Sequence, residues 1–557
     1  MKSLTDQPII VQNDRTILLE VNHPKFKKAR EKMASFAELV KSPEYFHTYR
    51  ITPISLWNAA ANGFSAMEII HVLQQYSKTG VPKQVEEDIH NYIERYGLLS
   101  FERVDHQILC KSKDPMVFEG LIPYPSVQKY FKEKVSRGTY IIDEKDRGFL
   151  KQELIKLGYP VQDFAGYQEG EFLSISLPSR SKSGKTFHLR DYQRKAIDIF
   201  YEKGAVSGGS GVIVLPCGSG KTIVGLGIME LLQSETLILT TNATSVRQWI
   251  DELLEKTTLT KEQVGEYSGQ KKEVKPVTVA TYQILTYRSK DTLEFEHMKL
   301  FQKRDWGLII YDEVHLLPAP IFRQTANIQA KRRLGLTATL IREDGKEDEV
   351  FSLIGPKKYE VPWLQMEERG WIAKAVCTDI RIPLPVKWAK QYIEASKRLK
   401  YRIASTNPTK IKVVKELLKR HQEESILIIG QYLDQLKDLA KELKVPLVTG
   451  NVKQQERDRI FQSFRTGDTK VLIVSKVANF AIDLPDAKVA IQVSGTFGSR
   501  QEEAQRLGRI LRPKDGENEA YFYSLISHQT VDQDYALKRQ LFLLEQGYEY
   551  AIQDYLV

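Results

Sequence analysis

Cysteine is scarce in this chain. Three cysteines are present among 557 residues, at Cys110, Cys217 and Cys377, and no two of them form a C-x-x-C pair. This scarcity excludes a disulfide framework and indicates no zinc or iron–sulfur site, which fits a reducing cytosol. The chain also lacks an apolar run long enough for a membrane span, and its first residues contain no apolar core of a signal peptide. We therefore expect a cytoplasmic protein.

The residues that are present describe a globular protein with a basic balance. Apolar residues make up 42% of the chain and charged residues 27%, so a sizeable core can form. A chain of 557 residues is too long to fold around a single hydrophobic core, so its length predicts three or four domains. The net charge of +10 favours a polyanion such as nucleic acid as partner, although a basic surface alone does not identify one.

The first third of the chain predicts two small domains. Residues 1–115 begin with a hairpin and continue with helices, one of which starts at the capping box of Ser65 and Glu68. We expect a winged-helix-like module here, and a small helical scaffold fits the same pattern. Residues 116–180 mix short strands with a helix from Lys145 to Leu157 and end in a polar linker, which predicts a small α+β domain.

Short apolar runs separated by helical stretches fill the remainder. This pattern is typical of parallel sheets that helices cover on both faces. It occurs over residues 181–360 and again over 361–540, which predicts two α/β domains followed by a tail at 541–557. The predicted strands are 212–215, 237–240, 277–280, 308–311, 426–429, 471–474, 489–493 and 521–523.

A glycine-rich turn between an apolar strand and a helix predicts an ATP site. In Gly218-Ser219-Gly220-Lys221-Thr222, backbone N–H groups at a helix N-terminus would hold phosphate. The lysine would reach the β- and γ-phosphate oxygens, and the threonine would bind Mg²⁺. Leu215 stands where the strict pattern has glycine, so the match is to the looser helicase form.

Two further strings supply carboxylates and hydroxyls. Asp312 and Glu313 follow an apolar strand, which assigns the first to the metal and the second to the catalytic base. His315 is interpreted as coupling the nucleotide state to DNA, and a packed histidine is the alternative. Thr337 and Thr339 are suited to switching hydrogen bonds between states.

Arginines late in the chain would complete the site. Arg509 and Arg512 lie on one predicted helical face, with Gln505 a turn earlier, and guanidinium groups stabilise charge during phosphoryl transfer. Upstream of the glycine-rich turn, Gln193 is suited to the edge of adenine and Arg190 to its face.

Loops after two strands, one in each α/β domain, are placed to meet a nucleic-acid backbone. Thr244 and Arg247 follow a strand of the first α/β domain, and Ser475 and Lys476 follow one of the second. Contacts of this kind set position without selecting sequence.

The order of these strings resembles superfamily 2 helicases. Directly after Thr339, the triplet Arg342-Glu343-Asp344 is similar to the hallmark of the XPB family of DNA helicases. Further strings of that family resemble 370–374, 505–513 and, near the N-terminus, 49–52 and 77–82. The resemblance covers nearly the whole chain, whose shortness is similar to that of bacterial-type members.

The resemblance implies two RecA-like domains and a 3′–5′ translocase that opens duplex DNA with ATP, in DNA repair. Arg342, Glu343 and Asp344 would then act where the strands separate, and Asp483 would belong to the nucleotide site. Residues 116–177 would form a damage-recognition-like domain. From the residues alone, the triplet is interpreted as a solvated acidic loop.

A basic and aromatic stretch between Lys387 and Arg402 resembles a shortened form of the DNA-gripping thumb of this family. We expect Lys387, Trp388 and Arg398 to contact DNA, because basic groups neutralise phosphates and aromatic rings stack on bases. A basic amphipathic helix is the alternative. One departure from eukaryotic-type members, Val477-Ala478-Asn479 in place of Val-Gly-Asp, leaves coupling through these positions open.

Two other functions fit parts of the pattern. An RNA helicase of superfamily 2 is expected to carry Asp-Glu-Ala-Asp rather than Asp-Glu-Val-His, and an ATP-gated DNA clamp needs no catalytic glutamate. We expect ATP and Mg²⁺ as cofactors, forked or duplex DNA as substrate, a nuclease or repair-complex protein as partner, and a monomer.

Overall fold

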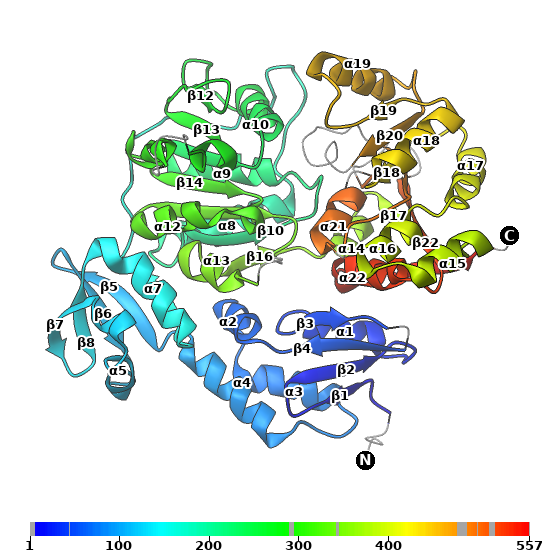
Figure 1. The fold of residues 1–557 in the computed structure, drawn as a ribbon. Coiled ribbons are helices and arrows are strands. Elements are labelled where there is room, and N and C mark those ends of the chain that lie inside the picture. Colours follow the sequence, from blue (N-terminus) through cyan, green and yellow to red (C-terminus); the bar gives the residue numbers. More distant parts are fainter. Residues whose placement is uncertain are drawn as a thin grey trace. The chain divides into compact units, whose positions relative to one another are not determined.

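A computed structural model describes residues 6–43, 45–288, 295–340, 345–475, 487–497, 499–508, 510–511 and 518–555. Contacts divide the chain into two compact units, one formed mainly by residues up to 360 and the other mainly by residues from 361 onward (Figure 1). Within these described ranges, no helix has both the length and the apolar character needed to cross a membrane.

A four-stranded sheet in the order β1-β2-β4-β3 opens the first unit. β1 pairs antiparallel with β2, which confirms the predicted hairpin, and the capping box of Ser65 and Glu68 is also confirmed. The region contains more sheet than the expected helical module. Its elements are β1 (Ile9–Val11), β2 (Thr16–Glu20), α1 (Phe26–Met33), β3 (Glu38–Lys41), β4 (Phe46–Arg50), α2 (Pro53–Ala61), α3 (Ala66–Tyr76) and α4 (Lys83–Arg95).

A buried histidine packs between this sheet and α1. The ring of His47, on β4, makes an edge contact with the ring of Phe26, with centroids 5.3 Å apart. Burial, assisted by the charge of Arg30, lowers the pKa of His47 to about 4. The imidazole is therefore neutral near pH 7 and resists protonation in the folded chain.

A second sheet, of five strands in the order β7-β8-β6-β5-β9, spans the boundary expected between residues 115 and 116. β6 pairs with β8 and β5 with β9, so strands on both sides of that boundary share one sheet. The expected boundary is therefore displaced toward residue 98. The elements are β5 (Leu99–Val104), β6 (Gln107–Ser112), α5 (Met116–Leu121), α6 (Pro125–Gln128), β7 (Phe131–Ser136), β8 (Thr139–Ile142), α7 (Arg147–Lys156) and β9 (Val161–Phe164).

Buried charges join α7 to the rest of the first unit. The carboxylate of Asp163 accepts hydrogen bonds from Arg147 Nη2 at 2.6 Å and from Lys151 Nζ at 2.9 Å. Lys151 also donates to the side chain of Gln329, and Arg147 is fully buried. Burial lowers the pKa of Lys151 to about 7, and the two cations hold the pKa of Asp163 below its usual range.

A parallel sheet of seven strands follows, in the order β12-β13-β11-β14-β15-β10-β16, with helices on both faces (Figure 1). It confirms the first predicted α/β domain and its four predicted strands. The strands are β10 (Ser210–Val214), β11 (Thr236–Thr240), β12 (Val264–Tyr267), β13 (Val277–Thr281), β14 (Leu308–Asp312), β15 (Arg332–Thr337) and β16 (Lys357–Glu360). The helices named below are α8 (Asp191–Tyr201), α9 (Lys221–Leu232), α10 (Ala243–Lys256), α12 (Ala319–Asn327) and α13 (Glu347–Leu353).

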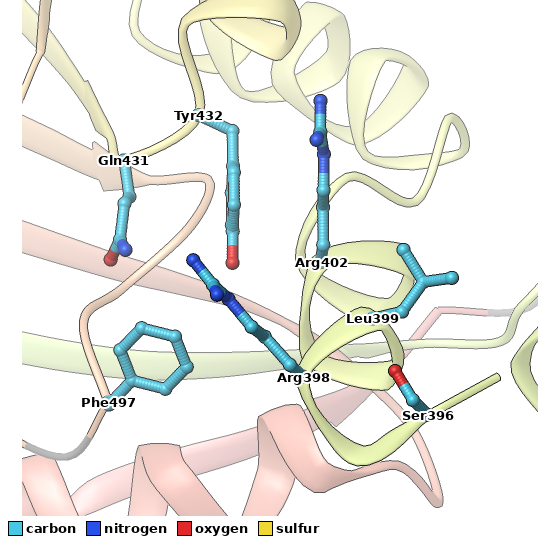
Figure 2. Close-up of a pocket in the computed structure, with 7 residues that line it drawn as sticks. All are labelled: Ser396, Arg398, Leu399, Arg402, Gln431, Tyr432 and Phe497. Carbon is cyan, nitrogen blue, oxygen red and sulfur yellow. The ribbon is translucent and has the colours of Figure 1, made fainter.

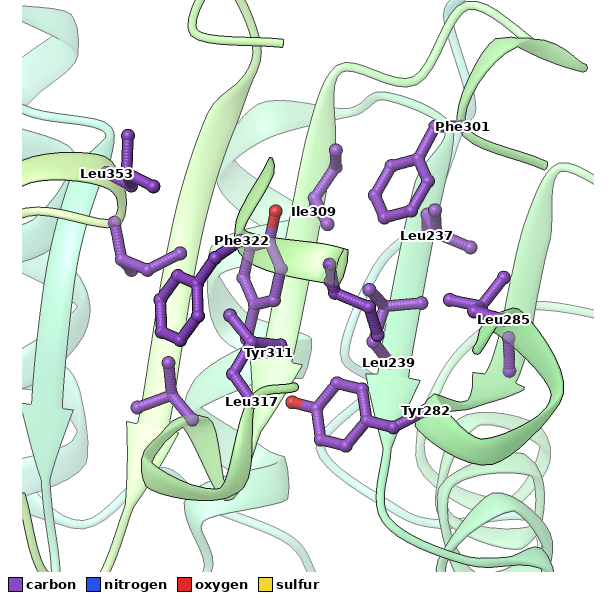
Figure 3. Close-up of a cluster of buried hydrophobic side chains, with 14 of the residues drawn as sticks. Leu237, Leu239, Tyr282, Leu285, Phe301, Ile309, Tyr311, Leu317, Phe322 and Leu353 are labelled. Carbon is purple, nitrogen blue, oxygen red and sulfur yellow. The ribbon is translucent and has the colours of Figure 1, made fainter. Parts of the chain in front are cut away.

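The core of this domain explains the continuous apolar runs. Leu237, Leu239 and Ile309 on the central strands are fully buried, because helices cover both faces of the sheet. Figure 3 shows Tyr311 and Phe322 among the aromatic members of this cluster. The hydroxyl of Tyr311 lies 2.9 Å from Thr325 Oγ1, so the one polar atom of the ring is hydrogen-bonded.

The second unit contains another parallel sheet of seven strands, in the order β19-β20-β18-β21-β22-β17-β23. It confirms the second predicted α/β domain. The strands are β17 (Lys374–Ile382), β18 (Ile426–Gly430), β19 (Leu447–Val448), β20 (Val471–Ser475), β21 (Val489–Gln492), β22 (Glu519–Ser527) and β23 (Tyr550–Asp554). The helices include α14 (Trp363–Glu368), α15 (Val386–Glu394), α16 (Lys397–Ser405), α17 (Lys410–Arg420), α18 (Leu433–Leu443), α19 (Gln454–Arg465), α21 (Arg500–Gly508) and α22 (Val531–Glu545).

Two expected loose segments are in fact bound to the fold. The tail expected from residue 541 contains the end of α22 and β23, which pairs with β17 from Cys377 to Arg381. The polar linker at 178–185 is fastened to α10, since the backbone N–H of Lys182 donates to Glu255 O and that of Ser183 to Glu255 Oε1.

Candidate active site

The glycine-rich loop connects β10 to the first turn of α9. Gly218 and Gly220 have φ angles of 79° and 83°, a region that glycine enters without steric cost. Within the loop, the backbone N–H and the hydroxyl of Ser219 both donate to Pro216 O, the latter at 2.7 Å. Leu215 is fully buried and its N–H donates to Thr337 O, so this position extends the sheet instead of entering the loop. That explains why leucine stands there.

Gln193 lies against this loop. A Cβ built on Gly220 would come within 2.7 Å of Gln193 Nε2, so glycine leaves room for the amide. The other end of that amide is fixed, because Gln193 Oε1 accepts from the backbone N–H of Arg190 at 2.9 Å at the start of α8. The structure thus brings Gln193 and the phosphate loop together, as the sequence predicts for one site.

The paired carboxylates occupy the end of β14, two strands from β10 in the sheet. Glu313 has φ 52° and ψ 52°, a left-handed conformation that is costly for a residue with a side chain. Lys221 Nζ lies 3.7 Å from Glu313 Oε1, so the loop lysine and the expected base are neighbours. Asp312 Oδ2 accepts a hydrogen bond from Trp249 Nε1 at 2.9 Å.

Trp249 is a site residue that sequence reasoning missed. It is buried on α10, and its indole N–H holds the carboxylate of Asp312 through a hydrogen bond. Its position on the apolar face of a predicted helix indicates only packing. The contact with Asp312 depends on the order of the strands, which the sequence pattern does not supply.

His315 and Thr337 form a buried hydrogen-bonded pair. Thr337 Oγ1 lies 2.7 Å from His315 Nδ1, donates to Thr339 O at 2.5 Å and accepts from the backbone N–H of Thr339. Since the hydroxyl proton is used on a carbonyl, His315 Nδ1 must be the donor to Thr337, which fixes the tautomer. The same Nδ1 lies 3.5 Å from Glu313 Oε2. His315 is therefore buried and packed, and it also lies close to the carboxylate of Glu313.

Comparison with known proteins identifies the family. The family described as "ERCC3/RAD25/XPB C-terminal helicase" matches residues 366–556, "Helicase conserved C-terminal domain" matches 9–136, and "Type III restriction enzyme, res subunit" matches 186–342. The chain is 50% identical to proteins named DNA 3'-5' helicase XPB from Kineococcus radiotolerans and Mycobacterium tuberculosis, over 99% of this chain and 97% and 98% of theirs. A general transcription and DNA repair factor IIH helicase/translocase subunit XPB from Enterocytozoon bieneusi is 33% identical over 98% of this chain and 92% of its own.

The chain belongs to the XPB family. The expected resemblance is thereby confirmed, including its extent over nearly the whole chain and its likeness to bacterial members.

Several expected site residues of this XPB-family chain lie outside the described residues. These are Arg342, Glu343, Asp344, Lys476, Asp483, Arg509 and Arg512, together with the departure at 477–479. Gln505 lies on α21 and is half-buried. The arginines and the family triplet therefore stay predictions.

The oxygen donors at the loop fit a magnesium ion. Burial, followed by the charge of Glu313, raises the pKa of Asp312 to about 6, so a cation bound there would favour its charged form. A hydroxyl from Thr222 and a carboxylate from Asp312 are donors that Mg²⁺ accepts, and Mg²⁺ usually completes its shell with phosphate and water. In the described part of the chain, no cluster of three or more His, Cys, Asp or Glu side chains could hold a metal alone.

The residues expected at DNA differ in exposure. Arg247 is exposed and Thr244 half-buried near the start of α10, which is capped by Asn242 through hydrogen bonds from the N–H groups of Thr244 and Ser245. Ser475, at the end of β20, is only 2% exposed, which does not favour a direct contact in this conformation.

The thumb-like stretch forms two short helices instead of one. Lys387 and Trp388 lie on α15, which buries no residue completely, and Arg398 lies exposed on α16. Ala395, between them, has an extended backbone and ends α15. The stretch is thus helical with an interruption at Ala395, and the DNA-gripping thumb and the basic amphipathic surface both stay predictions.

Proposed function

We propose that this chain, an ATP-dependent 3′–5′ DNA helicase of the XPB type, hydrolyses ATP with residues at the carboxyl ends of β10, β14 and β15. The observation that carries this proposal is the 3.7 Å approach of Lys221 Nζ to Glu313 Oε1, with Asp312 beside them. These strands are neighbours in the sheet, and ligands of open α/β sheets bind at such edges. The ends of the strands thus supply a cation, a base and a metal ligand.

Each residue has a distinct role in this proposal. Lys221 neutralises the β- and γ-phosphates, and Glu313 accepts a proton from the attacking water. Thr222 and Asp312 would hold Mg²⁺, which neutralises charge on the phosphates when it is bound. Arg509 and Arg512 would contribute guanidinium groups from the second domain.

The remaining nucleotide contacts follow from the loop and from α8. Gly218, Ser219 and Gly220 would surround the phosphates at the start of α9, because the N-terminus of a helix binds anions. Arg190 and Gln193 would hold the adenine, and Asp483 would belong to the same site.

Coupling to DNA is assigned to four residues. His315 is hydrogen-bonded to Thr337 and lies 3.5 Å from Glu313 Oε2, so a shift of the imidazole would reach the base. Thr339 exchanges two hydrogen bonds with Thr337. Gln505 would act from the second domain on the same nucleotide.

DNA is proposed to contact both units. Thr244, Arg247, Ser475 and Lys476 would follow its backbone, the thumb-like Lys387, Trp388 and Arg398 would grip it, and Arg342, Glu343 and Asp344 would act where the strands separate. Such phosphate contacts set register without choosing sequence.

We assign the domains as follows: an N-terminal domain to about residue 97, a damage-recognition-like domain to 177, a first helicase domain to 360 and a second from 361. A repair role, a nuclease or repair-complex partner, a monomeric state and a cytoplasmic location are further proposals. They rest on the family and on DNA as substrate.

The catalytic assignment is tested by Glu313→Gln. Loss of the base should lower DNA-stimulated ATP turnover by about 10²-fold or more while ATP binding remains. Glu133→Gln, on the exposed strand β7, makes the same change in charge away from the site and should leave turnover unchanged. Turnover of Glu313→Gln at the rate of the unmodified chain would make the assignment wrong.

The substrate is tested by comparing stimulation of ATP turnover by double-stranded DNA, single-stranded DNA and RNA. Stimulation by RNA alone would favour the RNA-helicase alternative. Unwinding of 3′-tailed but not 5′-tailed duplexes is expected. Triplex displacement without unwinding would show translocation only, and neither activity would favour an ATP-gated clamp.

A further inference from the structure

A pocket in the second unit lies between α16 and two loops that follow strands. Its volume is about 410 Å³, and it is lined by Ser396, Arg398, Leu399, Arg402, Gln431, Tyr432 and Phe497. Ser396 lies at the N-cap position of α16 and the next three lie along that helix. Gln431 and Tyr432 follow β18, and Phe497 lies beyond the end of β21. Figure 2 shows Arg398 extending from its helix toward the space between Gln431, Tyr432 and Phe497.

The pocket combines positive charge with flat apolar surface. Among the described residues, Arg398 has no carboxylate within ion-pair distance, whereas Arg402 Nη2 lies 2.6 Å from Asp434 Oδ2. Phe497 is 54% exposed although it is a large apolar residue. An exposed aromatic ring beside an unpaired arginine is typical of sites for a ligand that is both aromatic and anionic.

A buried hydrogen-bond acceptor without a partner limits the chemical class of ligand further. Gln431 Oε1 is buried and has no hydrogen-bond partner within the described ranges, while the backbone N–H of the same residue donates to Ser494 Oγ at 2.9 Å. A buried acceptor of this kind requires a donor. Nucleobases carry N–H donors on their edges, whereas a free carboxylate or phosphate group alone carries none at neutral pH.

The loop that contains Phe497 is held in place by buried side chains packed against it. The ring of Tyr401, 1% exposed, lies 4.7 Å from the ring of Phe497, and its hydroxyl donates to Gly495 O at 2.6 Å. Arg539 Nη1 donates to Thr496 O at 3.0 Å. The backbone of Gly495 packs so closely on Arg539 that no side chain fits there, since a Cβ would lie 2.3 Å from Arg539 Cζ. The exposed ring is thus pre-organised, which reduces the entropy lost when a ligand binds.

We propose that this pocket binds one unstacked nucleotide of a DNA single strand. The base stacks on Phe497, the phosphate faces Arg398, and the base edge donates to Gln431 Oε1. The volume suits one nucleotide and is too small for a base pair with its backbone. The proposal rests on the proposed DNA helicase function and adds a base-stacking site to it.

The test measures binding of the full chain to two fluorescent oligonucleotides by anisotropy. One is an ordinary single strand, and the other has the same phosphates with abasic positions. Phe497→Ala should weaken binding of the ordinary strand by roughly 5- to 150-fold and leave the abasic strand nearly unchanged. Arg398→Gln should weaken binding of both strands, because phosphate contacts do not depend on the base.

Two control variants make the same chemical changes elsewhere. Phe172, 73% exposed in the first unit, is changed to alanine, and Arg420, exposed on α17, to glutamine. Both should bind the two strands as the unmodified chain does. Melting temperatures establish that Phe497→Ala remains folded, which is expected because the ring is largely exposed.

Equal losses on both strands, or no loss on either, would overturn the proposal. The second result would leave a protein segment as the occupant of the pocket. If the unmodified chain binds neither strand and DNA does not stimulate its ATP turnover, the proposed function itself fails. If it binds both strands equally well, only the stacking site fails.

Discussion

The hydroxyl of Thr337 connects three parts of the ATP site. It accepts a hydrogen bond from His315 Nδ1 and makes two hydrogen bonds with the backbone of Thr339. The Thr337 side chain is fully buried. Thr337→Val keeps the volume and removes only this hydroxyl. We expect the substitution to slow ATP turnover, because His315 must find another acceptor and the nearest carboxylate is that of Glu313.

The size of the effect follows from the groups that lose a partner. The imidazole Nδ1–H of His315 and the backbone N–H of Thr339 are both buried, and each costs about 1–3 kcal/mol when it is left without an acceptor. A turn of His315 toward Glu313 Oε2, now 3.5 Å away, would recover part of this cost. It would also draw the base away from its water. A misorientation worth about 2 kcal/mol slows turnover by about 30-fold.

The assay compares ATP turnover and strand unwinding in Thr337→Val and Thr337→Ser. The serine variant keeps the hydroxyl and should turn over ATP within about threefold of the unmodified chain, whereas the valine variant should lose about 10- to 100-fold. Nucleotide binding should change little in either variant, because Thr337 lies at the end of β15 and not in the phosphate loop. Equal turnover in the two variants would refute the role of the hydroxyl.

Three further outcomes follow from the geometry. Gly220→Ala should weaken ATP binding by about tenfold or more, because a side chain strains the left-handed backbone and crowds the amide of Gln193. Gly63→Ala, at φ 86° with open space around it, should leave ATP binding unchanged in the same titration. Because the folded-state pKa of His47 is lower than its unfolded value, the unfolded chain binds more protons between about pH 4 and 6.5. The free energy of unfolding should therefore fall as the pH drops through that window, by up to about 3 kcal/mol. Hydrogen exchange over β4 should show this loss in the unmodified chain and not in His47→Phe. Asp163→Asn should destabilise by about 3–5 kcal/mol because it leaves two buried cations, and Lys151→Met by clearly less in the same melting experiment; equal losses would contradict the buried-pair argument.

The two parallel sheets were predictable because burial on both faces leaves a direct mark in the sequence. Runs such as 237–240 and 426–429 are apolar at every position, and both became central strands with bounds within a residue or two. β23 leaves no such mark. Only Tyr550 of its five residues is even half-buried, because β23 is the edge strand of its sheet. A sequence pattern that reports burial cannot find a strand that is exposed.

The candidate site was predictable in its residue types and not in its contacts. Lys221 and Glu313 were named from strings that lie far apart in the chain, and the strand order brings them together. Trp249 was not named, because its contact with Asp312 requires β14 to lie beside β11, whose following helix is α10. The displaced boundary near residue 98 has the same origin, since the partner of β5 is β9, more than fifty residues later.

The backbone of Glu313 shows why such a site breaks local rules. A left-handed conformation in a residue with a long side chain costs about 1–2 kcal/mol, and no turn signal such as glycine or asparagine marks it in the sequence. In return, the chain turns sharply after Asp312, so that one carboxylate meets Trp249 while the next meets Lys221. A 3₁₀ turn follows at once, closed by the N–H of Leu316 donating to Glu313 O at 2.9 Å. Strain of this kind persists only where the surrounding contacts fix it, and here they include the lysine of the phosphate loop. Glycine at this position would relieve the strain and remove the carboxylate, so the strain and the chemistry belong to the same residue.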